Sequence, residues 1–470
     1  MEATRPRSLI LADDNLGNGL IARRAHLIGI AGSGMRAMAE ALLGWGWKLS
    51  GSDLNLDGVH PLGASGVHLC QGHAVKHVPA VAELVLFSDA IPADNPELRC
   101  AAELGIPTMS YFQMLGQLSE GRRTLAIAGT HGKSTTTGMA AHLLIEAGCD
   151  PTVFCGAAPL GKTSGGRAGQ SDLWLIEACE YRANFLHLRP RQAVILGIEP
   201  DHFDCFDSPQ ELQGAFARFA ASVPDDGLVL ARHDCSSTRR VIAGLTCRVE
   251  TFGLDPDADW SAENLAEESG LFRFGICHQG RKLCNVRLPV PGRHNVLNAL
   301  AAAALACENG LSGQQVAAGL AGFPGLQRRL EMRGFWRGAT LIDDYAHHPT
   351  EVAAALAAVR GLFPRRRVWC VFQPHQVSRT ERLLDELAES LQNADKVLVS
   401  EIFRAREGGP RPGEVTAADL ARLARAGGVE VLPARTDEEI RRTLETRLAA
   451  SDVLIVMGAG DTAGLWPMEK

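Results

Sequence analysis

Short apolar runs alternate with helix-like segments along most of the chain. Residues 26–30 read as a buried strand, followed by a glycine loop and an Ala/Met-rich helical segment to Leu43, and a second strand at 47–50 ends in Gly51-Ser52-Asp53. Such alternation is typical of parallel α/β architecture. The same pattern predicts further strands at 83–91, 124–128, 173–177, 193–198, 228–231, 339–343, 367–372, 396–400, 429–432 and 452–456, a β-rich stretch at 247–290, and helices at 95–104, up to 147, 294–308, 350–360, 379–392, 416–425 and 436–449.

Two glycine loops, each between a strand and a helix, lie about a hundred residues apart. Each strand-loop-helix unit builds its own site at the carboxyl ends of a parallel sheet, so the loops imply two α/β domains. A third alternating block begins near Gly325. The length of 470 residues also favours about three domains. We predict boundaries at 1–122, 123–325 and 326–470.

Composition excludes several classes of protein. Lys plus Arg number 47 and Asp plus Glu 54, a net charge of −7, which disfavours a nucleic-acid backbone as the default partner. No stretch offers about 20 apolar residues for a membrane span, and residues 1–20 lack the features of a secretory signal. The 12 cysteines are scattered singly without a Cys-x-x-Cys pair, so we expect reduced, buried thiols in a cytoplasmic protein.

The strongest local signal is the loop Ala128-Gly-Thr-His-Gly-Lys-Ser-Thr135 between a strand and a helix. Phosphate binding needs inward backbone N–H groups, an ammonium for the β/γ oxygens and a hydroxyl for Mg²⁺, and Gly-Lys-Ser at a helix start supplies all three. Isoleucine stands at position 127, where the strict Gly-x4-Gly-Lys-Ser pattern has glycine. The placement between strand and helix still favours a nucleotide site over a plain turn.

The first glycine loop, Gly29 to Gly34, is less specific. With Asp53 about 20 residues further on, it partly fits a dinucleotide fingerprint, but alanine occupies the second glycine position. By its residues alone it permits NAD, another nucleotide-like ligand, or simple helix–sheet packing.

Acids and histidines follow several apolar strands. Glu177 ends one predicted strand and Asp201-His202 follows another, so both should project at the carboxyl edge near Lys133. Two further polar clusters, 343–349 and 373–380, follow strands of the third block. Caps and solvated turns are the alternative for each cluster, but two of them in one domain favour a site.

Taken together, these motifs resemble the Mur ligase family over almost the whole chain after residue 25. The matching segments are HLIGIAGSGM (26–35), SGSDL (50–54), SDAIPADNPEL (88–98), AGTHGKSTTT (128–137), PGRHNVLNALAA (291–302), LIDDYAHHPTEV (341–352), VFQPHQVSRT (371–380) and MGAGD (457–461). The resemblance implies a Rossmann-like N-terminal domain that binds a UDP-sugar, a central P-loop-type ATPase domain with a mainly parallel sheet, and a Rossmann-like C-terminal domain that binds the acceptor. It displaces the NAD interpretation of the first loop.

The implied activity is ATP-dependent amide formation between the carboxylate of UDP-N-acetylmuramate and the amine of L-alanine, through an acyl phosphate, in peptidoglycan synthesis. The implied ligands are ATP and Mg²⁺, with no nucleic acid and no membrane insertion, and the implied state is a monomer or weak homodimer. The resemblance also implies roles for the residues that stand at matching positions in these motifs. They are Lys133, Glu177 and His202 for catalysis; Gly129, Thr130, His131, Gly132, Lys133, Ser134, Thr135, Asn295, Asn298, Arg329 and Asp344 for the nucleotide; Ser134, Glu177 and His202 for Mg²⁺; and Gly32, Ser33, Gly34, Asp53, Tyr345, His347 and Arg379 for the substrates.

This chain departs from the family pattern in three places. The usual Glu-Ala-Asp-Glu-Ser-Asp run reads Glu177-Ala-Cys-Glu-Tyr-Arg182, which loses two carboxylates and gains a cation. Leu330 replaces the aromatic residue that usually follows Arg329. No lysine occurs from 163 to 281, so the carbamylated lysine of other amino-acid-adding branches has no candidate there. This favours the L-alanine branch or the branch that attaches a whole tripeptide. Residues 180–189 run on without the insertion typical of the tripeptide branch, so the L-alanine branch is preferred. The tripeptide branch, a non-catalytic relative and an unrelated P-loop kinase or ATPase are the alternatives.

Overall fold

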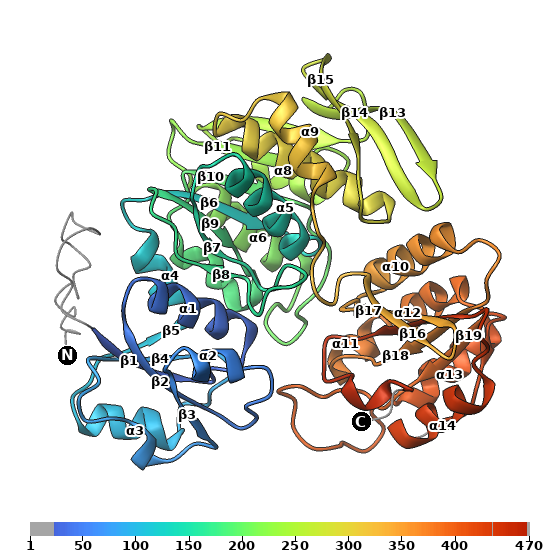
Figure 1. Cartoon of the computed structure of the whole chain (residues 1–470), viewed down its shortest axis with the longest axis horizontal. Helices are drawn as coiled ribbons and strands as arrows, with labels where there is room; N and C mark the ends of the chain where they lie inside the picture. Colours follow the sequence, from blue (N-terminus) through green and yellow to red (C-terminus); the bar gives the residue numbers. More distant parts are fainter. Residues whose placement is uncertain (1–22, 435, 468–470) are drawn as a thin grey trace.

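The computed structural model describes residues 23–434 and 436–467, and the chain forms three α/β units, each around its own sheet (Figure 1). The expectation about a secretory signal concerns residues outside the described part. Within those ranges every helix is too short or too polar to span a bilayer.

The N-terminal unit is a five-stranded parallel sheet. Its order is β3 (His68–Gln71), β2 (Lys48–Asp53), β1 (Arg24–Ile28), β4 (Leu84–Phe87) and β5 (Thr108–Ser110). Its helices are α1 (Ser33–Gly44), α2 (His60–Ala64), α3 (Pro96–Glu103) and α4 (Tyr111–Ser119). Because the strands are parallel, the first glycine loop and Asp53 lie together at their carboxyl ends.

The central unit has a ten-stranded sheet. Its order is β15 (Arg281–Arg287), β14 (Leu271–His278), β13 (Trp260–Glu268), β12 (Arg248–Gly253), β11 (Leu228–Arg232), β10 (Gln192–Ile195), β6 (Arg123–Ala128), β9 (Leu173–Glu177), β7 (Thr152–Phe154) and β8 (Gly166–Arg167). Strands β13 to β15 pair antiparallel and project from the molecule (Figure 1), whereas the middle of the sheet is parallel. The helices are α5 (Lys133–Glu146), α6 (Pro209–Ala220), α7 (Ser236–Ile242), α8 (Arg293–Glu308) and α9 (Gly313–Ala321). The alanine-rich α8 is buried along most of its length and packs on α5, since its small side chains allow close approach.

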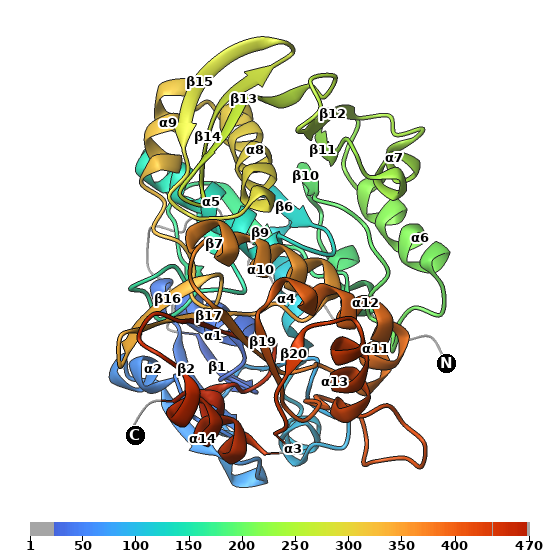
Figure 2. The same cartoon turned by 90° about the vertical axis from the view of Figure 1, so that its right-hand side faces the viewer.

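The C-terminal unit is a six-stranded sheet in the order β16 (Glu331–Trp336), β17 (Ala339–Asp344), β21 (Val453–Met457), β18 (Val368–Phe372), β19 (Lys396–Val399) and β20 (Glu430–Val431). Only β16 pairs antiparallel, and separate apolar clusters cover the two faces. The helices are α10 (Pro349–Leu362), α11 (Val377–Arg382), α12 (Leu384–Ser390), α13 (Ala417–Ala426) and α14 (Asp437–Arg447). Helix α10 lies against α8, which brings this unit against the central one (Figure 2).

Two details differ from the sequence-based expectations, and a third refines them. The helix predicted at 379–392 is divided at Leu383, whose φ of −120° is not helical, into α11, α12 and a short 3₁₀ turn. The central sheet is mainly parallel, as predicted, and the β-rich stretch predicted at 247–290 contains the antiparallel β13–β15 meander, because these strands are joined by tight turns too short for a crossover. All 12 cysteines are free as expected, but only Cys100, Cys155, Cys247, Cys277 and Cys370 are buried.

Candidate active site

The phosphate-type loop joins β6 to α5 and depends on two glycines. Gly129 and Gly132 have φ of 142° and 80°, which L side chains rarely adopt. A Cβ on Gly132 would also lie 2.5 Å from Oδ1 of Asn298 on α8. The loop therefore requires glycine both for its conformation and for the close approach of α8.

Lys133 begins α5, and its ammonium points back into the loop. Nζ donates to the carbonyl oxygens of Gly129 (2.6 Å) and Thr130 (3.0 Å) and to Oε1 of Glu180 (2.8 Å). Burial opposes the charged form, but the Glu180 carboxylate outweighs it and raises the pKa of Lys133. Lys133 is thus a fully charged cation held at the loop.

Glu180 is a site residue that the sequence analysis did not single out. It is 1% exposed, and although burial alone would raise its carboxyl pKa, Lys133 and His202 lower it. The same Oε1 lies 3.1 Å from Nε2 of His202, whereas Oε2 has no hydrogen-bond partner within the described part of the chain. The only sequence signal was its place in the acidic run after β9.

Glu177 and His202, predicted as one metal pair, have different partners in this structure. The Glu177 carboxylate accepts from Ser134 Oγ (2.9 Å) and from the Gly156 amide (2.6 Å), while His202 turns to Glu180. Ser134 and Glu177 place two oxygens side by side at the start of α5, the kind of ligand that Mg²⁺ prefers. A shared Mg²⁺ on Glu177 and His202 remains a prediction.

A pocket opens beside this loop, between α8, the end of β10 and α10. Apolar side chains such as Leu196, Phe252 and Phe323 form one part of its wall, and polar groups form the rest, a composition suited to a base and its phosphates. Of the residues predicted for the nucleotide, those on the wall are His131, Gly132, Thr135, Asn295, Asn298, Arg329 and Asp344; residues on it that the sequence analysis missed are Glu199, Arg232, His294, Thr350 and Glu351.

Asp344 and the two asparagines have well-defined hydrogen bonds. The Asp344 carboxylate accepts from the amides of Leu330 (2.7 Å) and Ala346 (2.8 Å), and burial raises its pKa to about 6 despite nearby Arg329. Asn298 donates to Oδ1 of Asn295 at 2.9 Å. Both amides are therefore held in one orientation at the pocket.

The C-terminal acceptor candidates meet the central unit at a buried ion pair. Arg379 Nε donates to Oδ1 of Asp201 at 2.8 Å, and its Nη1 lies 2.9 Å from Nδ1 of His375. His347 Nδ1 lies 2.9 Å from the Tyr345 carbonyl oxygen. Burial lowers the pKa of His347 to about 4, so this imidazole is neutral at neutral pH.

Glu351 joins the acceptor side to the phosphate loop. One carboxylate oxygen lies 3.0 Å from Nδ1 of His131, and the other lies 3.3 Å from Nδ1 of His347. Burial alone would lower the pKa of His131, but Glu199 and Glu351 raise it to about 9. Glu351 is also the third residue of α10 and part of its capping box, which is the one sequence signal that could have found it.

The candidate UDP-sugar residues lie in the N-terminal unit, at the ends of β1 and β2. Asp53 Oδ2 accepts from the Ala31 amide at 2.9 Å, so it fastens the first glycine loop. Gly32 is the N-cap of α1 and Ser33 is its first residue. A Cβ on Gly34 would lie 3.1 Å from the Tyr111 ring, so glycine there allows close packing.

Family models match the chain in three consecutive parts. They are the Mur ligase family catalytic domain at residues 24–123, the Mur ligase middle domain at 127–306, and the Mur ligase glutamate ligase domain at 328–460. The UDP-N-acetylmuramate--L-alanine ligase of Clostridium acetobutylicum is 38% identical over 445 residues, which cover 94% of this chain and 96% of the relative. The chain belongs to the Mur ligase family.

Two solved Mur ligase structures have the same architecture. The UDP-N-acetylmuramate-alanine ligase of Thermotoga maritima superimposes with a TM-score of 0.78 at 24% identity, covering 94% of this chain and 96% of that one. A murein peptide ligase of Psychrobacter arcticus superimposes with a TM-score of 0.73 at 26% identity, covering 95% and 98%. The three-unit α/β fold expected from the sequence is confirmed.

The altered acidic run of this Mur ligase forms a local contact of its own. Tyr181 Oη donates to Oδ2 of Asp204 at 3.0 Å, and the guanidinium of Arg406, from the C-terminal unit, lies 4.3 Å from the Tyr181 ring centroid. Arg182 has a φ of 52° and also lies over that ring, at 5.4 Å. The replacements thus add a cation–π contact between the central and C-terminal units.

Proposed function

We propose that this Mur ligase joins the carboxylate of UDP-N-acetylmuramate to the amine of L-alanine with ATP, and releases ADP and phosphate. The reaction builds a peptidoglycan precursor. The observation that carries this proposal is the match to an L-alanine ligase over 94% of this chain, together with a phosphate-type loop whose lysine is charged and 15% exposed.

The chemistry explains why ATP is needed. A carboxylate is a poor electrophile toward an amine, so the γ-phosphoryl group is first transferred to a carboxylate oxygen. The amine then attacks the carbonyl carbon of the acyl phosphate, the tetrahedral intermediate collapses, and the carbon–oxygen bond to phosphate breaks. The protein contributes mainly positioning and charge neutralisation.

On the nucleotide side, Lys133 would contact the β/γ-phosphate oxygens after leaving its loop carbonyls and Glu180. Asn295, Asn298, Arg329 and Asp344 would contact the rest of ATP from the pocket wall. Ser134 would hold one Mg²⁺, and Glu177 and His202 would together hold a second. Bound Mg²⁺ would offset the phosphate charge during transfer.

On the substrate side, the loop with Gly32, Ser33 and Gly34, fastened by Asp53, would hold the UDP-sugar. Arg379 would bind the carboxylate of L-alanine, because a guanidinium can donate two parallel bonds to both oxygens. His347 is close enough to feel the charge of Arg379, and the Tyr345 ring lies 5.6 Å from the His347 ring. A neutral His347 suits a site that must receive an uncharged amine.

Location and assembly complete the proposal. We infer a cytoplasmic enzyme, in keeping with its free cysteines, that acts without nucleic acid or membrane insertion as a monomer or weak homodimer.

Phosphate release tests the function directly. The purified chain is given ATP, Mg²⁺ and UDP-N-acetylmuramate, with L-alanine, glycine, L-serine or the tripeptide added in turn. We expect release that depends on L-alanine. Release without acceptor dependence would refute a ligase, and preference for the tripeptide would assign the chain to the tripeptide-attaching branch.

A further inference from the structure

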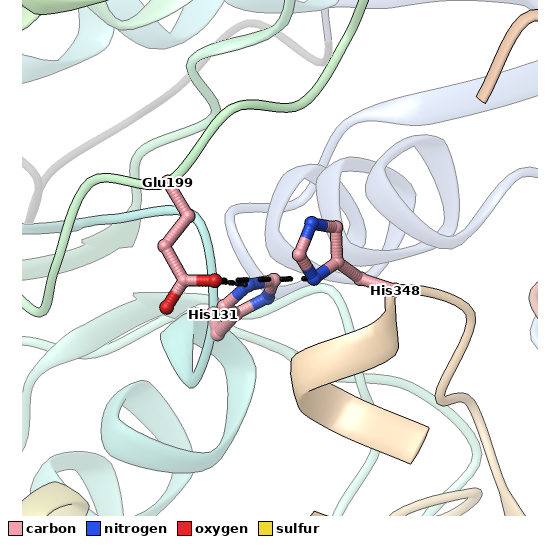
Figure 3. A group of neighbouring side chains, drawn as sticks. All are labelled: His131, Glu199 and His348. Carbon is pink, nitrogen blue, oxygen red and sulfur yellow. Dashed lines mark ion pairs between the residues drawn. The ribbon is translucent and has the colours of Figure 1, made fainter. Parts of the chain in front are cut away.

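Three metal-ligating side chains from separate parts of the chain converge between the central and C-terminal units (Figure 3). His131 belongs to the phosphate-type loop, Glu199 follows β10, and His348 is the N-cap of α10. One ligand atom from each lies within 4.8 Å of the other two. Glu199 Oε2 is 3.4 Å from Nε2 of His131 and 4.0 Å from Nδ1 of His348.

The remaining nitrogen of each imidazole has an outer partner. His348 Nε2 lies 3.3 Å from the Pro200 carbonyl oxygen, which can only accept, so Nε2 carries the proton. The lone pair on Nδ1 accepts from the Thr350 amide at 3.3 Å, a long N-cap bond that a metal at Nδ1 would replace. His131 Nδ1 lies 3.0 Å from the Glu351 carboxylate, and its Nε2 has no hydrogen-bond partner among the described residues. Outer partners of this kind orient the histidine ligands of metal sites.

One of the three separations already equals that of a tetrahedral ion. Metal–nitrogen and metal–oxygen bonds of about 2.0–2.1 Å at a tetrahedral angle place neighbouring ligand atoms about 3.4 Å apart. The Glu199–His131 pair lies at that distance, whereas the Glu199–His348 pair, at 4.0 Å, and the two histidines, within 4.8 Å, would close in on binding. Two imidazoles and one carboxylate suit Zn²⁺ or a similar transition metal, whereas Mg²⁺ prefers oxygen ligands.

We propose that His131, Glu199 and His348 form a binding site for a Zn²⁺-like divalent cation that links the phosphate-type loop to the C-terminal unit. None of the three belongs to the set expected to hold Mg²⁺ (Ser134, Glu177 and His202), so this site is distinct from the Mg²⁺ site, although His131 and Glu199 also line the nucleotide pocket. With three protein ligands, it keeps a fourth position open for water or another oxygen. It stands independently of the proposed ligase function.

The competing account needs no metal. A protonated His131 lying between Glu199 and Glu351 would form an ion-paired cluster that explains the same side-chain positions. In that case the cluster would not bind Zn²⁺, and any Zn²⁺ bound by the chain would be held by its cysteine thiols.

The test measures metal binding by the full-length chain without nucleotide. The protein is stripped of metal, and Zn²⁺ affinity is measured against a chromophoric chelator, while Co²⁺ is used as a spectroscopic probe. The variants are Glu199→Gln, which removes a charged ligand but keeps the shape, and His348→Asn, which preserves a good N-cap. His142→Asn, on α5 and outside the cluster, is the matched control, and thermal unfolding checks that each variant folds.

We expect one Zn²⁺ per chain for the wild type and His142→Asn, and affinity at least about tenfold weaker for both cluster variants. Bound Co²⁺ should show tetrahedral visible bands without a thiolate charge-transfer band. Absence of binding in the micromolar range, equal affinity in all four proteins, or a thiolate band would each overturn the proposal.

Discussion

The buried pair of Asp201 and Arg379 should control how well the enzyme uses L-alanine. Asp201 lies in the central unit and Arg379 in α11 of the C-terminal unit; their side chains are 5% and 3% exposed and 2.8 Å apart. Burial alone would raise the pKa of the Asp201 carboxyl, but Arg379 and then His202 hold it well below its usual range. The pair is therefore fully ionised at neutral pH.

Asp201→Asn leaves the Arg379 guanidinium buried without its counter-ion. Breaking one side of such a pair costs about 3–5 kcal/mol. Because the partners belong to different units, most of that cost falls on the arrangement in which the two units meet. A loss of about 3 kcal/mol corresponds to roughly a 100-fold lower kcat/KM, and we expect it for L-alanine.

The assay follows phosphate release with L-alanine varied and both ATP and UDP-N-acetylmuramate saturating. Asp226→Asn is the matched control, since its pair with Arg191 is exposed (68% and 46%), and exposed pairs contribute about 0–1 kcal/mol. Its kcat/KM should change little. If Asp201→Asn stays within about threefold of the wild type while folding normally, the buried pair does not support the acceptor site.

Three further outcomes are expected. Lys133→Ala should abolish phosphate release in a chain that still folds, and near-normal turnover would show that the loop is not catalytic. Glu180→Gln removes the carboxylate that raises the pKa of Lys133, so the alkaline limb of the pH–rate profile should move toward neutral pH; an unmoved limb would contradict this role. In the N-terminal unit, burial alone would raise the pKa of Glu97, but hydrogen bonds from His26 and Ser52 lower it to about 2. That carboxylate therefore stabilises the fold above about pH 4.5, and the contribution is lost as pH falls toward 2. Glu97→Gln should accordingly lower the melting temperature clearly at pH 7 and much less at pH 2.5, and equal shifts at both would refute the assignment.

Much of the fold could be predicted because local pattern and tertiary environment agree. Residues 173–177 were predicted as a strand and form β9, because a short apolar run of this kind fits a buried parallel strand. Helix α8 was predicted at nearly its observed bounds from its alanine content. The division of 379–392 at Leu383 was not predictable in this way, because its sequence is helix-forming and the break is a matter of packing.

The residues of the candidate active site show the same contrast between local pattern and tertiary packing. The phosphate-type loop could be predicted because Gly-Lys-Ser between a strand and a helix is a contiguous pattern. Asp201 was singled out only by its place after a predicted strand, and Glu180 and Glu351 had no such pattern; each of the three gains its importance from a partner distant in the chain. A buried charge needs a counter-charge, but the sequence does not say which one the fold supplies.

The sequence by itself determined the order of strands, loops and helices, and the position of the phosphate-type loop, because these depend on neighbouring residues and backbone preferences. Only the tertiary structure decided that Lys133 meets Glu180, that His202 turns to Glu180 rather than pairing with Glu177, and that His131 faces His348. The physical reason is that such contacts depend on how the elements of the three units pack against one another, which no local periodicity records.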